Sequence, residues 1–455
     1  MKLRHSIYLI LITIMLFTAS SLQAEIDHIH FGSKINTLEG VTVTWRGNYS
    51  HCRIKWGYTD SYEKYTQDLE GRIEFGDSNY YLFDYTFPEK LTPSQTIHYA
   101  FQEFNGQYDC CQCTLNWTED YTFQTSSDIT SQHFTFIGGG DSRGEMCSSN
   151  MDGWKAVADK LYTTNAEFYL NMGDLYIQGG DKKKMDAWYN AGSGFLSQKM
   201  VFYGVGNHER YGDPFLTTFL SQFVLPENGN YSGLYYSFEF GNAAFIILST
   251  EYYLNTAKGK ALMDQQTNWL TEQLKKYRGK GTKTYKEWVF IGFHKPFFTI
   301  DGHMGEMTSA KTKDVTGGDF SQIWWKNLFD EYGVDVVLNG HTHLYMRSVP
   351  LLLKGTAQGG KDIMFDEKGL PTSKPDKPIV YGNQKNQGRL EIISGGFGVK
   401  LLTDKKIPFK DQWYVEKYSL DFHYCQFEVD GKTLNITVKR ISDDQVIDQL
   451  TLKHQ

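Results

Sequence analysis

The feature that most constrains this chain is a series of short apolar segments that alternate with segments of helical periodicity. Strands are predicted at 134–137, 168–171, 201–205, 245–248, 288–293 and 334–338. Helices are predicted between them at 154–162, 264–277 and 321–332, the last two with apolar residues at helical spacing. This alternation indicates an α/β domain from about residue 131, and in such folds the loops beyond the strand ends converge to build sites.

Residue types that bind metal ions follow five of these strands. The residues are Asp141, Asp174, Asn207, His294, His341 and His343. Glycines adjoin most of them, as in Gly140-Asp141 and Gly173-Asp174, and glycine lets the backbone turn tightly. A single Gly-Asp pair usually marks a turn, and a lone His-x-His pair is commonly part of a surface strand. All five blocks in this order are not expected by chance.

Together these residue types suit a centre of two metal ions that binds phosphate. Two ions held close together clamp a phosphate and activate a bound water. Such a centre needs a bridging carboxylate, further oxygen ligands and neutral imidazoles, which suit iron, zinc and manganese. A protonatable histidine near the leaving oxygen completes the set.

The region before residue 128 has a different pattern. β-Branched and aromatic residues dominate 41–45, 52–56, 80–85 and 96–101, and Gly, Asn, Asp and Pro turn signals separate them. The spacing predicts a β-sandwich over 25–128 with a linker at 125–128. At the other end of the chain, 351–387 predicts a long surface loop, and 424–429 with 434–438 predicts a closing hairpin.

The N-terminus has the order of a secretory signal peptide. Lys2 and Arg4 precede an apolar run at 7–17, and small and polar residues follow up to Ala24. The alternative is a membrane anchor, but the run is short for crossing a bilayer. We therefore expect residues 1–24 to be removed and the protein to be exported, either secreted or periplasmic.

Export would permit disulfides. The six cysteines are Cys52, Cys110, Cys111, Cys113, Cys147 and Cys425. The cluster at 110–113 matches no common zinc spacing, so disulfides from it to Cys52, Cys147 or Cys425 are the expectation.

Charge and hydropathy argue against nucleic-acid binding and against a membrane span. The net charge is −7, and Lys and Arg are scattered without a basic block, so nucleic acid has no electrostatic footprint. After the leader, no segment is long and apolar enough to predict a membrane span.

Two stretches, together with the metal-binding blocks, carry a resemblance to a known family. Residues 333–347 have the sequence GVDVVLNGHTHLYMR, and 293–298 have FHKPFF followed by His303. The chain resembles the calcineurin-like metallophosphoesterase superfamily, most closely the purple acid phosphatases with an N-terminal fibronectin-like domain. The resemblance implies a fibronectin type III-like sandwich over 25–128. For 131–455 it implies an α/β domain with two central mixed sheets flanked by helices.

The same resemblance implies hydrolysis of phosphate monoesters by attack of a metal-bound hydroxide. The implied cofactors are two metal ions, iron with zinc, manganese or a second iron, and the implied substrates are phosphorylated small molecules or phosphoproteins. Asp141 and His343 would bind the first metal, and Asp174 would bridge both. The second metal would be bound by Asn207, His294 and His341.

Two histidines would act on the substrate. His208 matches the family residue that faces the phosphate, as an electrostatic stabiliser or proton donor. His303, nine residues after His294, matches a family histidine near the leaving group. The alternative for His303 is an ordinary solvated loop histidine.

The chain departs from the family pattern at the first metal. The family's iron-binding Tyr lies three residues after the bridging Asp, but that position is Ile177, and Tyr176 lies one residue earlier. Other superfamily members have a His two residues after the first Asp, where this chain has Arg143. Tyr176 is thus a candidate ligand out of register. Arg143 is a candidate phosphate-binding residue, with a surface ion pair as the alternative.

Two other functions fit the same residues. A phosphodiesterase or nucleotidase would use the same metals with different loops around them. A catalytically dead surface-binding module would use the fold as a scaffold, and it predicts missing metal ligands.

Overall fold

The structure, a computed structural model, describes residues 26–66, 68–74, 77–104, 116–145, 150–229, 233–252, 256–308, 320–355 and 362–454. The expected signal peptide and four of the six cysteines, Cys110, Cys111, Cys113 and Cys147, lie outside these ranges. Among the residues that are described, no helix is both long enough and apolar enough to cross a membrane.

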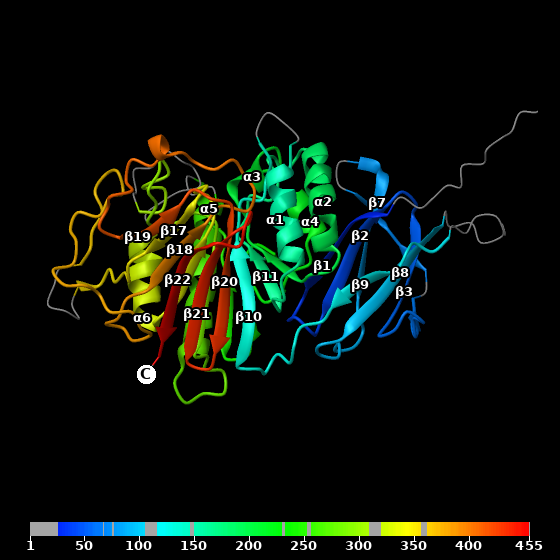
Figure 1. Cartoon of the computed structure of the whole chain (residues 1–455), viewed down its shortest axis with the longest axis horizontal. Coiled ribbons are helices and arrows are strands. Elements are labelled where there is room, and N and C mark those ends of the chain that lie inside the picture. Colours follow the sequence, from blue (N-terminus) through cyan, green and yellow to red (C-terminus); the bar gives the residue numbers. More distant parts are fainter. Residues whose placement is uncertain are drawn as a thin grey trace, which may run out of the picture.

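Two antiparallel sheets form the N-terminal region (Figure 1). Their facing side chains make one aromatic core, in which the Trp45 and Phe101 rings lie 4.4 Å apart and Phe31 stacks on Phe123 at 3.9 Å. The sheet β1-β2-β7-β6 comprises Asp27–Ser33, Val41–Gly47, Asp77–Thr86 and Arg72–Glu74. The other, β4-β3-β8-β9 with β5 beside β3, comprises Lys64–Tyr65, His51–Gly57, Thr96–Phe104, Tyr121–Gln124 and Leu69–Glu70.

Two mixed sheets form the larger region. The six-stranded sheet has the order β12-β11-β10-β20-β21-β22, and its strands are Val201–Tyr203, Phe168–Asn171, His133–Gly139, His423–Asp430, Thr433–Arg440 and Val446–Lys453. The seven-stranded sheet has the order β13-β14-β15-β16-β18-β17-β19. Its strands are Tyr236–Phe240, Ala243–Ile247, Trp288–Gly292, Val336–Asn339, Leu390–Ser394, Tyr345–Ser348 and Val415–Ser419.

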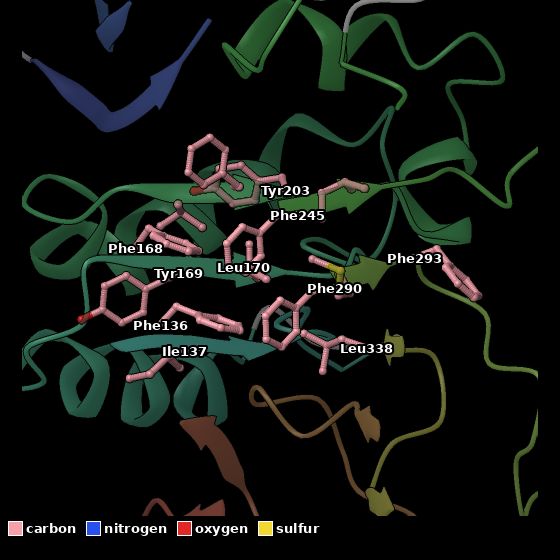
Figure 2. Close-up of a cluster of buried hydrophobic side chains, with 14 of the residues drawn as sticks. Phe136, Ile137, Phe168, Tyr169, Leu170, Tyr203, Phe245, Phe290, Phe293 and Leu338 are labelled. Carbon is pink, nitrogen blue, oxygen red and sulfur yellow. The ribbon is translucent and has the colours of Figure 1, made fainter. Parts of the chain in front are cut away.

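Phenylalanines fill the space between the two mixed sheets. Phe136 of β10 lies 4.9 Å from Phe245 of β14 and 5.0 Å from Phe290 of β15, measured between ring centroids. Figure 2 shows these rings beside Phe168 of β11. Because helices cover the outer faces, strands such as β14, β15 and β16 are buried at every position. This double burial explains why they show as continuous apolar runs in the sequence.

Helices cover the sheets on the outside. Helices α1 (Asp152–Tyr162) and α2 (Lys182–Leu196) lie on the six-stranded sheet, where the ring of Phe195 in α2 packs on Tyr169 of β11 at 4.9 Å. Helix α5 (Ala257–Arg278), the π-helix η1 (Ser321–Phe329) and α6 (Asp330–Tyr332) pack beside the seven-stranded sheet.

The predicted strands are confirmed within a few residues, but several elements were missed. Helix α2, the short helix α4 (Thr217–Gln222) and strands β13, β17, β18, β19 and β22 were not predicted. The segment predicted as one helix at 321–332 is mostly π-helix. The closing hairpin is confirmed, since β20 and β21 pair across Asp430 and Gly431, and β22 extends it.

The expectation of disulfides to Cys52 and Cys425 is wrong. Both are free, buried thiols. Cys52 lies in the aromatic core of the N-terminal sheets, and Cys425 lies in β20 at the centre of the six-stranded sheet. Each thiol acts as a small core residue, and burial raises the pKa of Cys425 to about 12.

Strand β1 joins the N-terminal sheets to the larger region by packing along α2 (Figure 1). A group of buried and half-buried charges lies at this contact. Asp186 of α2 accepts a hydrogen bond from Arg46 at 2.8 Å and lies 3.2 Å from His28 Nε2. Lys182, one turn earlier in α2, pairs with Glu74 of β6.

Candidate metal centre

The predicted metal-binding residues meet where strands of both mixed sheets end. Asp141 follows β10, Asp174 follows β11, and Asn207 begins the short helix α3 (Asn207–Arg210) after β12. His294 follows β15 of the other sheet, and His341 and His343 follow β16. These are the carboxyl ends of parallel strands, where sites in α/β folds are built.

The backbone at three of these residues is left-handed. Asp141, Asp174 and His341 have φ values of 64°, 55° and 69°. Residues other than glycine rarely adopt this conformation, and they cluster at functional sites when they do.

Glycines allow the loops to approach one another. A Cβ on Gly206 would lie 2.3 Å from Asp174 Oδ1, and a Cβ on Gly340 would lie 2.4 Å from Asp141 Oδ2. Neither position accepts a side chain without moving a carboxylate. These two glycines therefore make room for the acidic groups, in addition to letting the backbone turn tightly.

One half of the centre, called here the second site, is formed by Asp174, Asn207, His294 and His341. His294 Nε2 lies 3.2 Å from Asp174 Oδ1, 3.1 Å from Asn207 Oδ1 and 3.1 Å from His341 Nδ1. His294 Nδ1 donates to the Met172 carbonyl at 2.8 Å, so Nε2 carries the lone pair that a metal would use. Four donor atoms of the right types thus converge, and the site fits a divalent ion.

Neighbours orient the other two ligands of the second site. Asn207 Nδ2 donates to Tyr211 Oη at 3.2 Å, which leaves Oδ1 facing His294. His341 Nε2 donates to Glu306 Oε2 at 3.1 Å, which leaves Nδ1 free for a metal. Glu306 was not singled out in the sequence. The signal was present, because Glu306 lies three residues after His303 in the same loop.

The other half, called here the first site, is formed by Asp141, Asp174 and His343. Donor atoms of these three lie within 4.8 Å of one another. Asp141 Oδ1 is buried without a hydrogen-bond partner and lies 3.7 Å from His343 Nε2. His343 Nδ1 bonds to the Lys400 carbonyl at 3.1 Å, so its Nε2 lone pair also faces the site. An unpartnered buried carboxylate oxygen beside an imidazole lone pair fits a cation.

Arg143 also enters the first site. Its residue exposure is 7%, which makes the alternative of a surface ion pair wrong. Arg143 Nε lies 3.4 Å from Asp174 Oδ2, and Nη2 lies 3.2 Å from His343 Nε2.

Tyr176 packs edge-on against the ring of Trp188 in α2, with centroids 6.4 Å apart. Its hydroxyl is buried without a hydrogen-bond partner. Burial raises the pKa of Tyr176 well above its usual value, and the carboxylates of Glu209 and Asp213 add to this shift.

Glu209 is a further residue that holds the loops together. Its carboxylate accepts hydrogen bonds from the backbone amides of Asp174, Leu175 and Gly206 at 2.7–2.9 Å. It ties the loop after β11 to the loop after β12. Glu209 was not singled out from the sequence.

His208 and His303 contact different ligands of the centre. His208 Nε2 is 3.7 Å from Asp174 Oδ2, and Nδ1 bonds to the Ile177 carbonyl at 2.6 Å. His303 packs against the His341 ring in a tilted arrangement with centroids 4.1 Å apart and bonds through Nδ1 to Glu306 at 2.7 Å. His303 is therefore held in place, although 42% of its side chain is exposed.

The two histidines have opposite pKa shifts. Burial lowers the pKa of His208. Burial also opposes the charged form of His303, but Glu306 and Asp301 outweigh it and raise its pKa. Of the two, His303 holds a proton more readily near neutral pH.

Charge pairing dominates the bridging position. Burial opposes ionisation of Asp174, but His208, His294 and Arg143 hold its pKa well below the usual range. Burial raises the pKa of Asp141. The two carboxylates of the centre therefore have opposite pKa shifts, because nearby cations outweigh burial at Asp174 but not at Asp141.

Comparison with known proteins identifies the class. Residues 123–345 match the family model of the calcineurin-like phosphoesterases. The chain therefore carries a calcineurin-like phosphoesterase domain, and the families built on this domain use a binuclear metal centre.

The chain is also similar to acid phosphatases and purple acid phosphatases. Human acid phosphatase type 7 is 26% identical over 241 residues, which are 53% of this chain and 49% of the relative. Purple acid phosphatase 18 of Arabidopsis thaliana is 28% identical over 206 residues, 43% of this chain and 42% of the relative. The chain spans about half the length of the curated relatives that it matches.

Solved structures share the fold. Purple acid phosphatase PPD1 from yellow lupin (Lupinus luteus) seeds has a TM-score of 0.67 at 16% identity, covering 95% of this chain and 75% of that one. The structure of PhoD has a TM-score of 0.58 at 11% identity, covering 93% of this chain and 89% of that one. At these identities the likeness shows the fold alone.

Proposed function

We propose that this protein is an exported, metal-dependent phosphatase that hydrolyses phosphate monoesters. The observation that carries the proposal is the convergence of six metal-binding side chains in two groups that share Asp174. The family domain and the acid phosphatase relatives support the same chemistry. In this proposal residues 1–24 are a signal peptide, 25–128 are a fibronectin type III-like domain and 131–455 are the phosphoesterase domain.

Asp174, Asn207, His294 and His341 would hold one ion, and Asp141, Asp174 and His343 would hold another. Bound metal ions withdraw charge from a phosphate and lower the pKa of water beside it. Zinc, manganese and iron suit this mixture of oxygen and imidazole donors. Because Ile177 holds the position of the family's iron-binding tyrosine, the first site favours a divalent ion over ferric iron.

Side chains around the metals supply the remaining steps. His208 lies against Asp174 Oδ2 and would face the bound phosphate. His303, whose proton is stabilised by Glu306, would donate it to the leaving oxygen. Glu306 contacts both His303 and His341, so it links the proton donor to a metal ligand.

The rival functions make distinct predictions. A dead surface-binding module predicts missing ligands, whereas all six side chains are present and meet. A phosphodiesterase or nucleotidase would use the same metals, and a substrate panel separates it from a monoesterase.

The test is hydrolysis of p-nitrophenyl phosphate and bis-p-nitrophenyl phosphate by the purified chain without residues 1–24. We expect turnover of the monoester to exceed that of the diester, and chelation followed by dialysis to abolish both. Restoring Zn²⁺ or Mn²⁺ should restore turnover. Full activity in metal-stripped protein would exclude the proposal, and a preference for the diester would favour the phosphodiesterase.

A further inference from the structure

Arg143 lies in the position of a cation within the first site. Its Nε is 3.4 Å from Asp174 Oδ2, and its Nη2 donates to His343 Nε2 at 3.2 Å. The side chain is buried, and its backbone amide donates to the Asp174 carbonyl at 3.0 Å. These contacts hold the Arg143 side chain beside Asp174 and His343.

The two atoms that Arg143 contacts are donors that a metal in the first site would need. The Nδ1 of His343 is already bonded to the Lys400 carbonyl, so Nε2 offers a single lone pair. That lone pair accepts either an N–H of Arg143 or a metal ion, because a metal–nitrogen bond of about 2.1 Å leaves no room for the hydrogen bond. The guanidinium and the ion therefore compete for one atom.

Charge adds to this steric competition. A guanidinium stays protonated in proteins, so Arg143 cannot become neutral when a metal arrives. Two cations within a few ångströms repel each other, and the repulsion is larger in a buried site than in water. The carboxylates of Asp141 and Asp174 balance the charge of one cation better than the combined charge of the guanidinium and a metal ion.

The second site has neighbours of the opposite kind. His294 bonds to the Met172 carbonyl, Asn207 to the Tyr211 hydroxyl, and His341 to the carboxylate of Glu306. Each of these contacts leaves the metal-binding atom of its ligand available. None of them uses the lone pair that the ion would need.

We infer that Arg143 is the resident cation of the first site. The protein binds one divalent ion tightly at Asp174, Asn207, His294 and His341. A further ion enters beside Asp141 and His343 only by displacing Arg143. The inference rests on the metal centre of the proposed function and refines its stoichiometry.

The consequence for phosphate binding follows directly. With one ion bound, the opposite side of the phosphate would meet the planar guanidinium of Arg143 instead of a second ion. A guanidinium binds phosphate oxygens through two parallel hydrogen bonds. Arg143 would thus leave His343 for the substrate.

Metal counting tests the inference without relying on activity. Protein stripped with a chelator is titrated with Zn²⁺ by calorimetry, and the metal retained after dialysis is counted by mass spectrometry. We expect one tightly held ion per chain in the wild type, with any further ion bound about 100-fold more weakly because of the charge repulsion. Arg143→Gln should hold two ions with similar affinities.

Further variants locate the ion and separate charge from shape. Arg143→Lys keeps a cation and should stay at one tight ion. His343→Ala should keep that ion, and His294→Ala should lose it. Melting curves check that each variant folds. If Arg143→Gln does not fold, the number of ions bound by the wild type tests the inference by itself.

The outcomes distinguish this inference from the proposed function. Two ions of similar affinity in the wild type, or an unchanged count in folded Arg143→Gln, would overturn the role of Arg143 alone. One tight ion without any phosphatase activity would overturn the function alone. A wild type that binds no ion would overturn both.

Discussion

The two halves of the candidate metal centre share a bridging carboxylate but differ in their neighbours. Around the second site, carbonyl, hydroxyl and carboxylate groups bind the outer atoms of the ligands. Around the first site, Arg143 contacts the metal-binding atoms themselves. A complete set of ligand residues therefore does not fix how many ions are bound, because adjacent groups compete for the same lone pairs.

Removal of the shared ligand should have the largest effect. Asp174→Ala takes away the carboxylate that both halves use, so bound metal should be lost and turnover should fall to background. Metal counting and p-nitrophenyl phosphate hydrolysis measure the two effects. Asp159→Ala, which changes an exposed acid of α1 paired with Lys155, is the matched control and should match the wild type. Retention of metal in Asp174→Ala would mean that Asp174 is not a ligand shared by the two halves.

His208→Ala should impair catalysis while leaving both halves intact. The side chain lies 3.7 Å from Asp174 Oδ2 but belongs to neither group of metal-binding residues. Turnover should fall by about 10²–10³-fold, as expected when a donor to the reacting oxygens is lost. Metal content should stay at the wild-type value. Loss of metal would assign His208 to the ligands instead.

Glu306→Gln should weaken the second site selectively. The carboxylate accepts the Nε2 proton of His341, and the loss of such a partner lowers metal affinity by about 10–100-fold. Competition with a chromogenic chelator measures the dissociation constant. Glu331→Gln on α6, where the acid pairs with Lys354, is the control and should be neutral. An unchanged affinity in Glu306→Gln would show that the His341 ring is fixed by other contacts.

A change far from the metals should alter stability and leave turnover unchanged. Asp186 joins α2 to the N-terminal sheets. Burial opposes its charge, but His28, Lys182 and Arg46 hold its pKa below the unfolded value of 3.8. Its stabilisation is therefore present above pH 4 and is lost as the pH falls toward the lower folded pKa.

Asp186→Asn should accordingly lower the melting temperature at pH 7 by about 1 °C, the shift expected for about 1 kcal/mol in a chain of this size. The gap between variant and wild type should shrink below about pH 4. Calorimetric melting curves at several pH values measure both effects. A gap that is constant over the pH range would show that packing, and not charge, explains the loss.

Tyr176→Phe should have the smallest effect. The purple colour that the family name refers to arises when a tyrosinate donates charge to ferric iron. Here Ile177 holds the position of that tyrosine, and Tyr176, one residue earlier, packs against Trp188. Iron-loaded, oxidised protein should lack a strong visible charge-transfer band, and the substitution should leave the spectrum unchanged. A band that disappears in Tyr176→Phe would place its hydroxyl on the metal.

Much of the fold could be predicted because its signals are local. Strands β10, β11 and β15 are covered on both faces, so each is a continuous apolar run bounded by turn residues. Helix α2 was missed because it is not strongly apolar overall. Its buried residues, which include Met185, Trp188 and Gly192, recur at helical spacing but do not form a continuous apolar run. Strand β22 was missed because it is a half-exposed edge strand that gains its identity from pairing with β21.

By itself the sequence determined which residues meet. Strand ends followed by glycine and an acid, amide or imidazole indicate loops on one edge, and the order of the blocks matches one family. Only the tertiary structure decided what surrounds each side chain: Arg143 on His343, Glu306 on His341, Trp188 on Tyr176, and Cys52 and Cys425 as free thiols. The physical reason is that side-chain direction depends on the backbone turns at Asp141, Asp174 and His341, where φ is positive. These turns are stabilised by contacts between loops distant in sequence, which no local pattern reports.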